Sequence, residues 1–297
     1  MQKHYLSNND SLLKKASYLR IIAKDLADVM KAGNFSSLYK GQGVEFAGVR
    51  DYIRGDDVRN IDWNVTARMG HPYIKIFDEE RELQIFIIVD SSASMQQENS
   101  NEKNKYSVAA EAAALITMAA EINACPIGAV FFDGEIQFSC KPQSDKENTM
   151  KILNHLDKLP EVQNNGSALG SAINGAGKLL KTRSLVFILS DFRTSDWEKP
   201  LISLAHKNNV IALRLQDSYQ EELPEIGTVV FEDIESNLKM ELPTSSEQFK
   251  KAWKNYNTQH KERWEDFCIK HGILPVVMET KNEPLQVFNA ALGKRMR

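Results

Sequence analysis

Residues 83–95 read LQIFIIVDSSASM, and this stretch decides how the rest of the chain is interpreted. Six of the seven residues before Asp90 are apolar, without the polar alternation of a half-exposed strand. Strands with this composition are buried on both faces, as they are in parallel sheets. The sequence then turns abruptly polar, and Asp90, Ser92 and Ser94 stand two residues apart. We therefore predict a buried strand over 85–90 that ends in one carboxylate and two hydroxyl groups.

Similar apolar segments recur along the chain, and segments with helical spacing separate them. Two of these apolar segments, 184–191 and 210–217, also end in an aspartate, and the Ala-rich stretch 105–124 predicts a strong helix. Strands alternating with helices indicate an α/β domain with a doubly wound, mostly parallel sheet, helices on both faces and right-handed crossovers. Further strands are expected at 73–77, 127–134, 136–140, 228–233 and 273–280, and further helices at 9–31, 149–159, 167–181, 197–209, 246–272 and 284–297.

The composition is that of a soluble globular protein with two parts. We expect an N-terminal helix and charged arm over 1–82 and the α/β domain over 83–297. A hydrophobic fraction of 42% allows a sizeable core, and a net charge of −3 gives no sign of bulk nucleic-acid binding. No stretch approaches the roughly 18–20 apolar residues of a membrane helix, and the N-terminus lacks a signal-peptide core. The scattered Cys125, Cys140 and Cys268 predict reduced thiols and a cytoplasmic location.

Oxygen-bearing side chains follow two of the predicted strands. In open α/β sheets the ligand site lies beyond the carboxyl ends of the strands, so Asp90 and Asp191 should share one edge. They would repel each other there unless a positive charge lies between them. Side chains two apart in an extended loop point the same way, which aims Asp90, Ser92 and Ser94 at one point. Ser167, which could also be a plain helix N-cap, adds a hydroxyl. Such hard oxygens, with few carboxylates, suit Mg²⁺ or Mn²⁺.

This order of groups resembles the metal-ion-dependent adhesion site of von Willebrand factor A domains. In that family D-x-S-x-S follows an apolar strand, a hydroxyl follows in a later loop, usually from Thr, and a strand-terminal Asp completes the set. The resemblance implies a divalent ion with one position open to an acidic side chain of a partner protein. The five matching positions, in order, are Asp90, Ser92, Ser94, Ser167 and Asp191.

The charged segment before the domain narrows the resemblance. EFAGVRDYIRGDDVRNIDWNVTAR, residues 45–68, is similar to the signature arm of bacterial proteins grouped as domain of unknown function fifty-eight, where it precedes a von Willebrand factor A-like domain. Members are often encoded beside MoxR-type AAA+ ATPases, so the resemblance implies such an ATPase as partner. The matching positions are Arg50, Tyr52, Gly55, Asp56, Asp57, Arg59, Ile61, Asp62, Trp63, Ala67 and Arg68.

Two interpretations of this arm remain open. Its charges alternate in sign, which favours an internal web of ion pairs that holds the arm, with Trp63 as a buried anchor. Each exposed pair would contribute only about 0–1 kcal/mol. Asp56 or Asp57 is a candidate cap for a short helix that runs to Arg68. Alternatively, part of this surface docks a partner.

The sequence therefore favours a non-enzymatic, divalent-metal-dependent protein-binding module, an adaptor that works with a MoxR-type AAA+ ATPase. One alternative is a Mg²⁺-dependent phosphohydrolase with Asp90 as nucleophile. Phosphohydrolases of that type need a second acid two residues later, and Ser92 stands there. The other alternative is a metal-free scaffold whose edge is merely polar.

A glycine-rich stretch, GSAINGAGKLL over 170–180, raises the question of a phosphate-binding loop. The P-loop requires a Gly five positions before the Gly of the Gly-Lys pair, here Gly177-Lys178, and a Ser or Thr after the Lys. Ala172 and Leu179 stand at these positions. Because the stretch has helical spacing, we expect its glycines to let a helix approach a neighbouring segment closely.

Overall fold

The chain divides into two compact units in the computed structural model. The structure describes residues 23–28, 30, 44–79, 83–97, 103–158, 168–217, 228–233, 238–243 and 246–293. The large unit comprises Met1–Val29 and Gln84–Arg297, and the small unit comprises Met30–Leu83. Across these described ranges, none of the helices combines the length and the hydropathy needed to cross a membrane.

The small unit is an antiparallel hairpin with helical turns between its strands. β1 (Val44–Asp51) pairs with β2 (Tyr73–Glu79), and between them lie the 3-10 helix η2 (Val58–Asn60) and α2 (Trp63–Met69). The predicted short helix is therefore present. Its cap, however, is Asp62, whose carboxylate accepts the N–H groups of Asn64 and Val65, whereas Asp57 caps η2.

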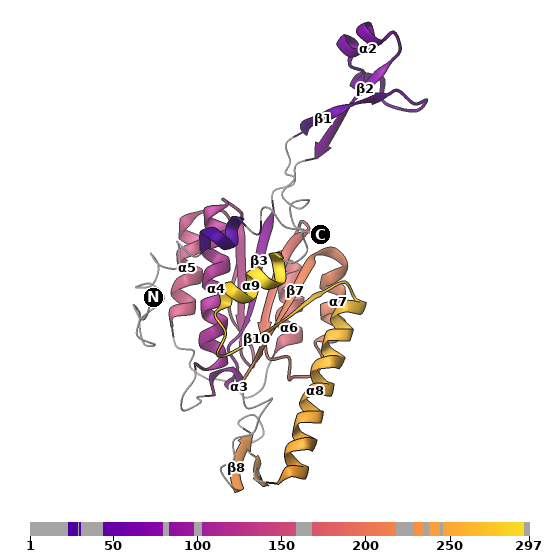
Figure 1. Cartoon of the computed structure of the whole chain (residues 1–297). Helices are drawn as coiled ribbons and strands as arrows, with labels where there is room; N and C mark the ends of the chain where they lie inside the picture. Colours follow the sequence, from indigo (N-terminus) through magenta and orange to yellow (C-terminus); the bar gives the residue numbers. More distant parts are fainter. Residues whose placement is uncertain are drawn as a thin grey trace, which may run out of the picture. The chain divides into compact units, whose positions relative to one another are not determined.

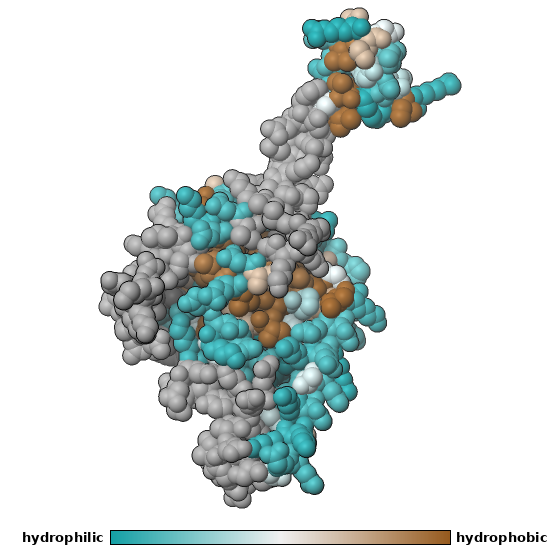
Figure 2. All heavy atoms as spheres, viewed as in Figure 1, coloured by the Kyte–Doolittle hydropathy of each residue, from teal (hydrophilic) through white to brown (hydrophobic). Residues whose placement is uncertain are grey.

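Among the described residues of the small unit, Arg50 and Asp56 form an ion pair, and the tryptophan is not buried. Arg50 holds Asp56 through two hydrogen bonds of 2.7 and 2.8 Å. Trp63 is 70% exposed, so the prediction of a buried anchor was wrong. It begins α2, a helix in which no residue is buried. Figure 2 shows hydrophobic residues at the surface of this unit, and Ile53, Val58 and Met69 are exposed there as well.

A six-stranded, mostly parallel sheet forms the centre of the large unit, a mixed α/β structure (Figure 1). Its strand order is β10-β7-β6-β3-β4-β5, and only β5 runs antiparallel to its neighbour. β3 lies in the middle, and the chain reaches β4 on one side of it and β6 on the other. The strands are β3 (Gln84–Asp90), β4 (Ile127–Phe132), β5 (Ile136–Gln143), β6 (Ser184–Ser190), β7 (Asn209–Gln216) and β10 (Leu274–Glu279).

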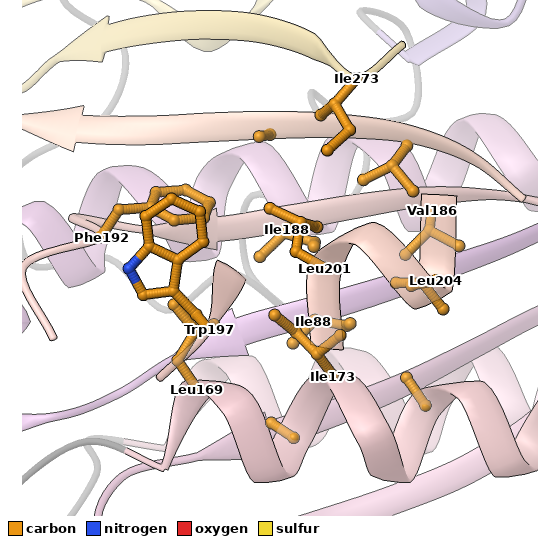
Figure 3. Packing of buried hydrophobic residues seen from close by; sticks show 14 of the residues in the cluster. Ile88, Leu169, Ile173, Val186, Ile188, Phe192, Trp197, Leu201, Leu204 and Ile273 are labelled. Atoms are coloured by element: carbon orange, nitrogen blue, oxygen red, sulfur yellow. The ribbon is translucent and has the colours of Figure 1, made fainter. Parts of the chain in front are cut away.

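Helices pack against both faces of this sheet, because successive side chains of a strand point to opposite faces. Phe187 of β6 contacts Phe288 of α9, which lies beside α4. Its neighbours Val186 and Ile188 point the other way, into a core shared with α6, α7 and α8 (Figure 3). The helices are α3 (Ala93–Gln96), α4 (Lys105–Ile122), α5 (Lys146–Asp157), α6 (Leu169–Leu179), α7 (Glu198–Lys207), α8 (Glu247–Lys270) and α9 (Pro284–Gly293).

Local sequence explains where α4 begins and why it is so deeply buried. Asn104 caps the helix by accepting the Ser107 N–H at 2.7 Å. The alanines that follow have the highest helix propensity and small side chains, so the helix can lie close against the sheet. Residues 23–28 and 30 are also helical, and the side chain of Asn123, just beyond α4, donates to the carbonyl of Ala27.

Besides β1, two segments that we did not foresee complete the described structure. β9 (Leu238–Pro243) pairs antiparallel with the predicted strand β8 (Thr228–Asp233) in a separate two-stranded sheet. α3 is the other, and it changes the geometry of the predicted metal-binding motif.

Candidate functional site

The end of β3 brings the first three predicted groups together. Asp90 is its last residue and has no exposed surface; its carboxylate accepts the Ser92 N–H at 3.0 Å. The expectation of an extended loop was wrong, because Ser92 is the N-cap residue of α3 and Ser94 lies in its first turn. The hydroxyl of Ser92 makes no capping hydrogen bond and instead lies 3.3 Å from the hydroxyl of Ser94. A helical turn, rather than extended backbone, thus gathers the two hydroxyls.

The neighbouring strand β6 supplies the next groups. Its last residue, Ser190, donates a hydrogen bond of 2.6 Å to the Asp90 carboxylate and accepts the Phe192 N–H at 3.1 Å. Asp191 follows directly and is 1% exposed. Since β3 and β6 pair in parallel register up to Val89 and Leu189, their carboxyl ends lie side by side. We call Asp90, Ser92, Ser94, Ser190 and Asp191 the rim site.

A lysine provides the positive charge that two such carboxylates require. Lys105, the first residue of α4, is 3% exposed, and its ammonium donates to Asp191 at 2.7 Å. The same nitrogen lies 3.9 Å from a carboxylate oxygen of Asp217, the residue that follows β7. Lys105 and Ser190 had no assigned role in the sequence analysis. Asp217 could have been found from the sequence, because it is the aspartate that ends the apolar segment 210–217.

The pKa values of the two buried carboxylates in the rim site are shifted in opposite directions. Burial, followed by the nearby negative charge of Asp191, raises the pKa of Asp90 to about 7, although Ser190 and Ser92 act against this rise. Burial alone would also raise the pKa of Asp191. The charge and hydrogen bond of Lys105, with a smaller contribution from Arg193, hold the pKa of Asp191 below its ordinary value. Environment therefore gives two similar residues different charge states near neutral pH.

The remaining predicted residue, Ser167, lies outside the described residues. Its successor Ala168 donates its N–H to the carbonyl of Asp133 at 2.8 Å. Asp133 follows β4, and its carboxylate accepts the Glu135 N–H at 2.9 Å. The start of α6 is thus tied to the carboxyl end of the strand on the other side of β3.

A second buried cation lies one strand further along the same edge. Arg214 of β7 is in register with Ser190 and is 3% exposed. A guanidinium nitrogen lies 3.0 Å from the Nδ1 atom of His260, and the group stacks over the ring of Trp264 at 5.7 Å. Burial, and then the charge of Arg193, lowers the pKa of Arg214.

The donor set is of the oxygen type. Asp90 and Asp191 contribute carboxylates, and Ser92, Ser94 and Ser190 contribute hydroxyls. Within the described parts of the chain, there is no group of three or more His, Cys, Asp and Glu side chains that could hold a metal ion. The rim site has only two such side chains, so hydroxyls or water would have to provide the other ligands of any ion.

Comparison with solved structures gives distant similarities. The structure of an aerotolerance-related membrane protein from Bacteroides fragilis is 15% identical, with a TM-score of 0.44, and the match covers 71% of this chain and 99% of that one. Proximal thread matrix protein 1 from the mussel byssus is 15% identical with a TM-score of 0.35, over 45% of this chain and 37% of that one.

Comparison with sequences gives the family. Uncharacterized protein Mb1516 of Mycobacterium bovis is 30% identical over 240 residues, which cover 79% of this chain and 75% of the relative. Uncharacterized protein Rv1480 of Mycobacterium tuberculosis matches to the same extent. The family model described as "Protein of unknown function DUF58" matches residues 48–263, which include most of the signature arm and the rim site. The chain therefore belongs to the DUF58 family.

Proposed function

We propose that this chain is a non-enzymatic protein-binding module whose rim site takes up Mg²⁺ or Mn²⁺ and presents it to a partner. The observation that carries the proposal is the gathering of Asp90, Ser92 and Ser94 at the end of β3, beside Asp191 at the end of β6. Ser92, Ser94 and Ser167, the last of which lies outside the described residues, would offer hydroxyls to the ion. Asp90 and Asp191 would act directly or through water. The bound ion supplies one coordination position for an acidic side chain of the partner.

The spacing and chemistry of these groups fit such an ion. Adjacent oxygens around an octahedral Mg²⁺ are about 2.9 Å apart, given metal–oxygen distances of about 2.0–2.1 Å. The hydroxyl oxygens of Ser92 and Ser94 are 3.3 Å apart and need only a small adjustment. Asp90 is ready to exchange a proton for a metal ion, because its raised pKa of about 7 leaves part of the population neutral near neutral pH.

We favour binding over phosphoryl transfer because of the environment of Asp90. A nucleophilic aspartate must turn an oxygen toward the phosphate. Asp90 is fully buried, and each of its oxygens already accepts a hydrogen bond, one from Ser92 and one from Ser190. These hydrogen bonds fix the orientation of the carboxylate, and each oxygen keeps a second lone pair that can contact a cation.

The proposed partner is a protein with an exposed Asp or Glu, and family resemblance suggests a MoxR-type AAA+ ATPase. The proposed location is the cytoplasm. All three cysteines, Cys125, Cys140 and Cys268, are free thiols in the structure, which agrees with a reducing compartment.

Thermal unfolding with and without divalent ions tests the proposal. Mg²⁺ or Mn²⁺ at a hundredfold excess over Kd should stabilise the protein by about 2.7 kcal/mol. Asp90→Ala should lose this gain. Asp133→Asn is the matched control, because it alters a buried strand-terminal aspartate that is not among the proposed ligands, and it should keep the gain. The proposal fails if Asp90→Ala responds as the wild type does. A response absent from all variants would favour the metal-free scaffold.

A further inference from the structure

Lys105 occupies an unfavourable position unless it serves the rim site. It is the first residue of α4, where the positive end of the helix dipole repels a cation. It is also 3% exposed, and a buried ammonium is expensive unless carboxylates compensate it. Asp191 at 2.7 Å and Asp217 at 3.9 Å provide that compensation. Nearby Lys103 differs, because it is partly exposed and pairs with Glu111.

The contact with Lys105 restricts what Asp191 can do. One carboxylate oxygen of Asp191 accepts the ammonium, and the other accepts the Arg193 N–H at 3.2 Å. Both oxygens therefore have a protein partner, and the carboxylate is fixed toward α4. Its negative charge is shared with Lys105 rather than fully offered to a metal ion.

We infer that Lys105 is the built-in counter-cation of the rim site and that its ammonium weakens the binding of a divalent ion there. This inference rests on the proposed function. When ionised, Asp90, Asp191 and Asp217 carry three negative charges, and Lys105 reduces the sum to two. A divalent ion then neutralises the cluster instead of leaving it negative, so the loaded site does not repel a partner's carboxylate. Lys105 is thus a positioning residue that makes metal binding modest and favours an acidic partner.

Mn²⁺ binding to the full chain tests this role, with the free ion followed by electron paramagnetic resonance. Lys105→Met keeps most of the length of the side chain but removes its charge. It should lower the melting temperature in chelator, yet bind Mn²⁺ at least about tenfold more tightly, because a like charge near the ion is gone. Lys105→Arg retains the charge and should keep an affinity close to that of the wild type. Lys103→Met, the matched control, should leave Mn²⁺ affinity unchanged.

A double variant covers the case in which Lys105→Met does not fold in chelator. Lys105→Met combined with Asp217→Asn has the same formal charge as the wild type over the cluster of Asp90, Asp191, Asp217 and Lys105. Its Mn²⁺ affinity should return to within about threefold of the wild-type value, since unit charges dominate the interaction at such distances. Mn²⁺ should also restore the fold of the single variant. The inference is overturned if Mn²⁺ does not restore the fold of Lys105→Met and the double variant binds Mn²⁺ more weakly than the wild type.

The outcomes separate this inference from the proposed function. If the wild type binds Mn²⁺ and Lys105→Met binds no more tightly, the inference is wrong and the proposed function stands. If only Lys105→Met binds, Lys105 acts as inferred and the wild-type chain is not a metal-dependent module. If neither binds, both are overturned.

Discussion

The hydroxyl of Ser190 donates a 2.6 Å hydrogen bond to the carboxylate of Asp90 and so joins two strand ends that lie 100 residues apart in the sequence. The same hydroxyl accepts the N–H of Phe192, a residue of the buried core. One buried serine therefore couples the rim site to the packing beneath it. The sequence motif contains Asp90, but this coupling depends on the register between β3 and β6.

Ser190→Ala should destabilise the protein and change the behaviour of Asp90. Loss of the hydroxyl leaves a buried acceptor and a buried N–H without their partner, which costs about 1–3 kcal/mol. The hydrogen bond from Ser190 also favours ionised Asp90, so its loss should move the pKa of Asp90 further up. Urea unfolding at several pH values measures both effects.

Ser184→Ala is the matched control, at the opposite end of the same strand. Ser184 is equally buried, and its hydroxyl donates to Thr182 at 2.9 Å and to Gln84 at 3.1 Å. Its loss should cost similar stability without changing the pH dependence. An identical pH profile for both variants would contradict the role assigned to Ser190.

Asp90→Asn should flatten the pH dependence of stability in the absence of metal. The pKa of Asp90 is about 7 in the folded protein and about 3.9 in an unfolded chain. The folded state therefore holds the extra proton between these values, and stability falls as the pH rises from about 4 to about 7. The loss is on the order of a few kcal/mol, at about 1.4 kcal/mol per pKa unit.

Asp191, whose pKa is lowered, affects stability in a different pH range. Its contribution is present above the unfolded pKa and is lost as the pH falls through the lower folded value, in the acid range. Urea unfolding in chelator between pH 5 and pH 8 thus separates Asp90 from Asp191. His155 and His260, whose pKa values burial lowers, also titrate there, so the difference between wild type and Asp90→Asn is the quantity that reports on Asp90. A slope in Asp90→Asn as steep as that of the wild type would show that another group titrates.

The regular elements of the large unit were predictable because their signals are local. Strands such as β3 and β6 are unbroken apolar runs, and the alanines of α4 have strong helix propensity. In the small unit, β1 and β2 pair around the intervening η2 and α2, with a register shift between Phe46 and Gly48. β1 was not foreseen, since its charged residues obscure the alternation that identifies a strand.

The rim site was predictable only in part. The rule that ligands bind beyond parallel strand ends places Asp90 and Asp191 correctly at one edge. The turn of α3 brings Ser92 and Ser94 together. It could not be predicted, because a helix of four residues is too short to show helical spacing in the sequence. Lys105 comes from a helix 86 residues before Asp191, and no local pattern marks a lysine as buried. Charge compensation predicted a cation beside Asp90 and Asp191, which the sequence analysis took to be a divalent metal ion, whereas the structure places the ammonium of Lys105 against Asp191.

Trp63 and Trp264 should respond very differently to substitution, because they are 70% and 3% exposed. Trp63→Ser should change stability by no more than about 0.5 kcal/mol. Trp264→Ala removes a ring that packs near Phe192 and Arg214, and should cost about 3–5 kcal/mol. Chemical denaturation measures both values, and acrylamide quenching should lose its most accessible component in Trp63→Phe. A large loss of stability in Trp63→Ser would restore the buried-anchor interpretation.

Two glycines of α6 give the sharpest test of how this helix packs. A Cβ atom at Gly170 would lie 2.5 Å from the carbonyl oxygen of Asp196, in the segment that follows the rim site, whereas a Cβ atom at Gly177 meets nothing closer than Leu204 at 3.8 Å. Gly170→Ala must therefore displace backbone and should cost about 1–3 kcal/mol. Gly177→Ala should stabilise the protein by about 0.5–1 kcal/mol through higher helix propensity.

Urea unfolding of both variants checks the sign of each change. Because the segment that contacts Gly170 begins at Asp191, Gly170→Ala should also weaken any metal-induced stabilisation, whereas Gly177→Ala should leave it intact. Equal effects of the two substitutions on stability would mean that close approach at Gly170 does not constrain α6. A stable Gly170→Ala with a full metal response would show that the loop after β6 can move without disturbing the rim site.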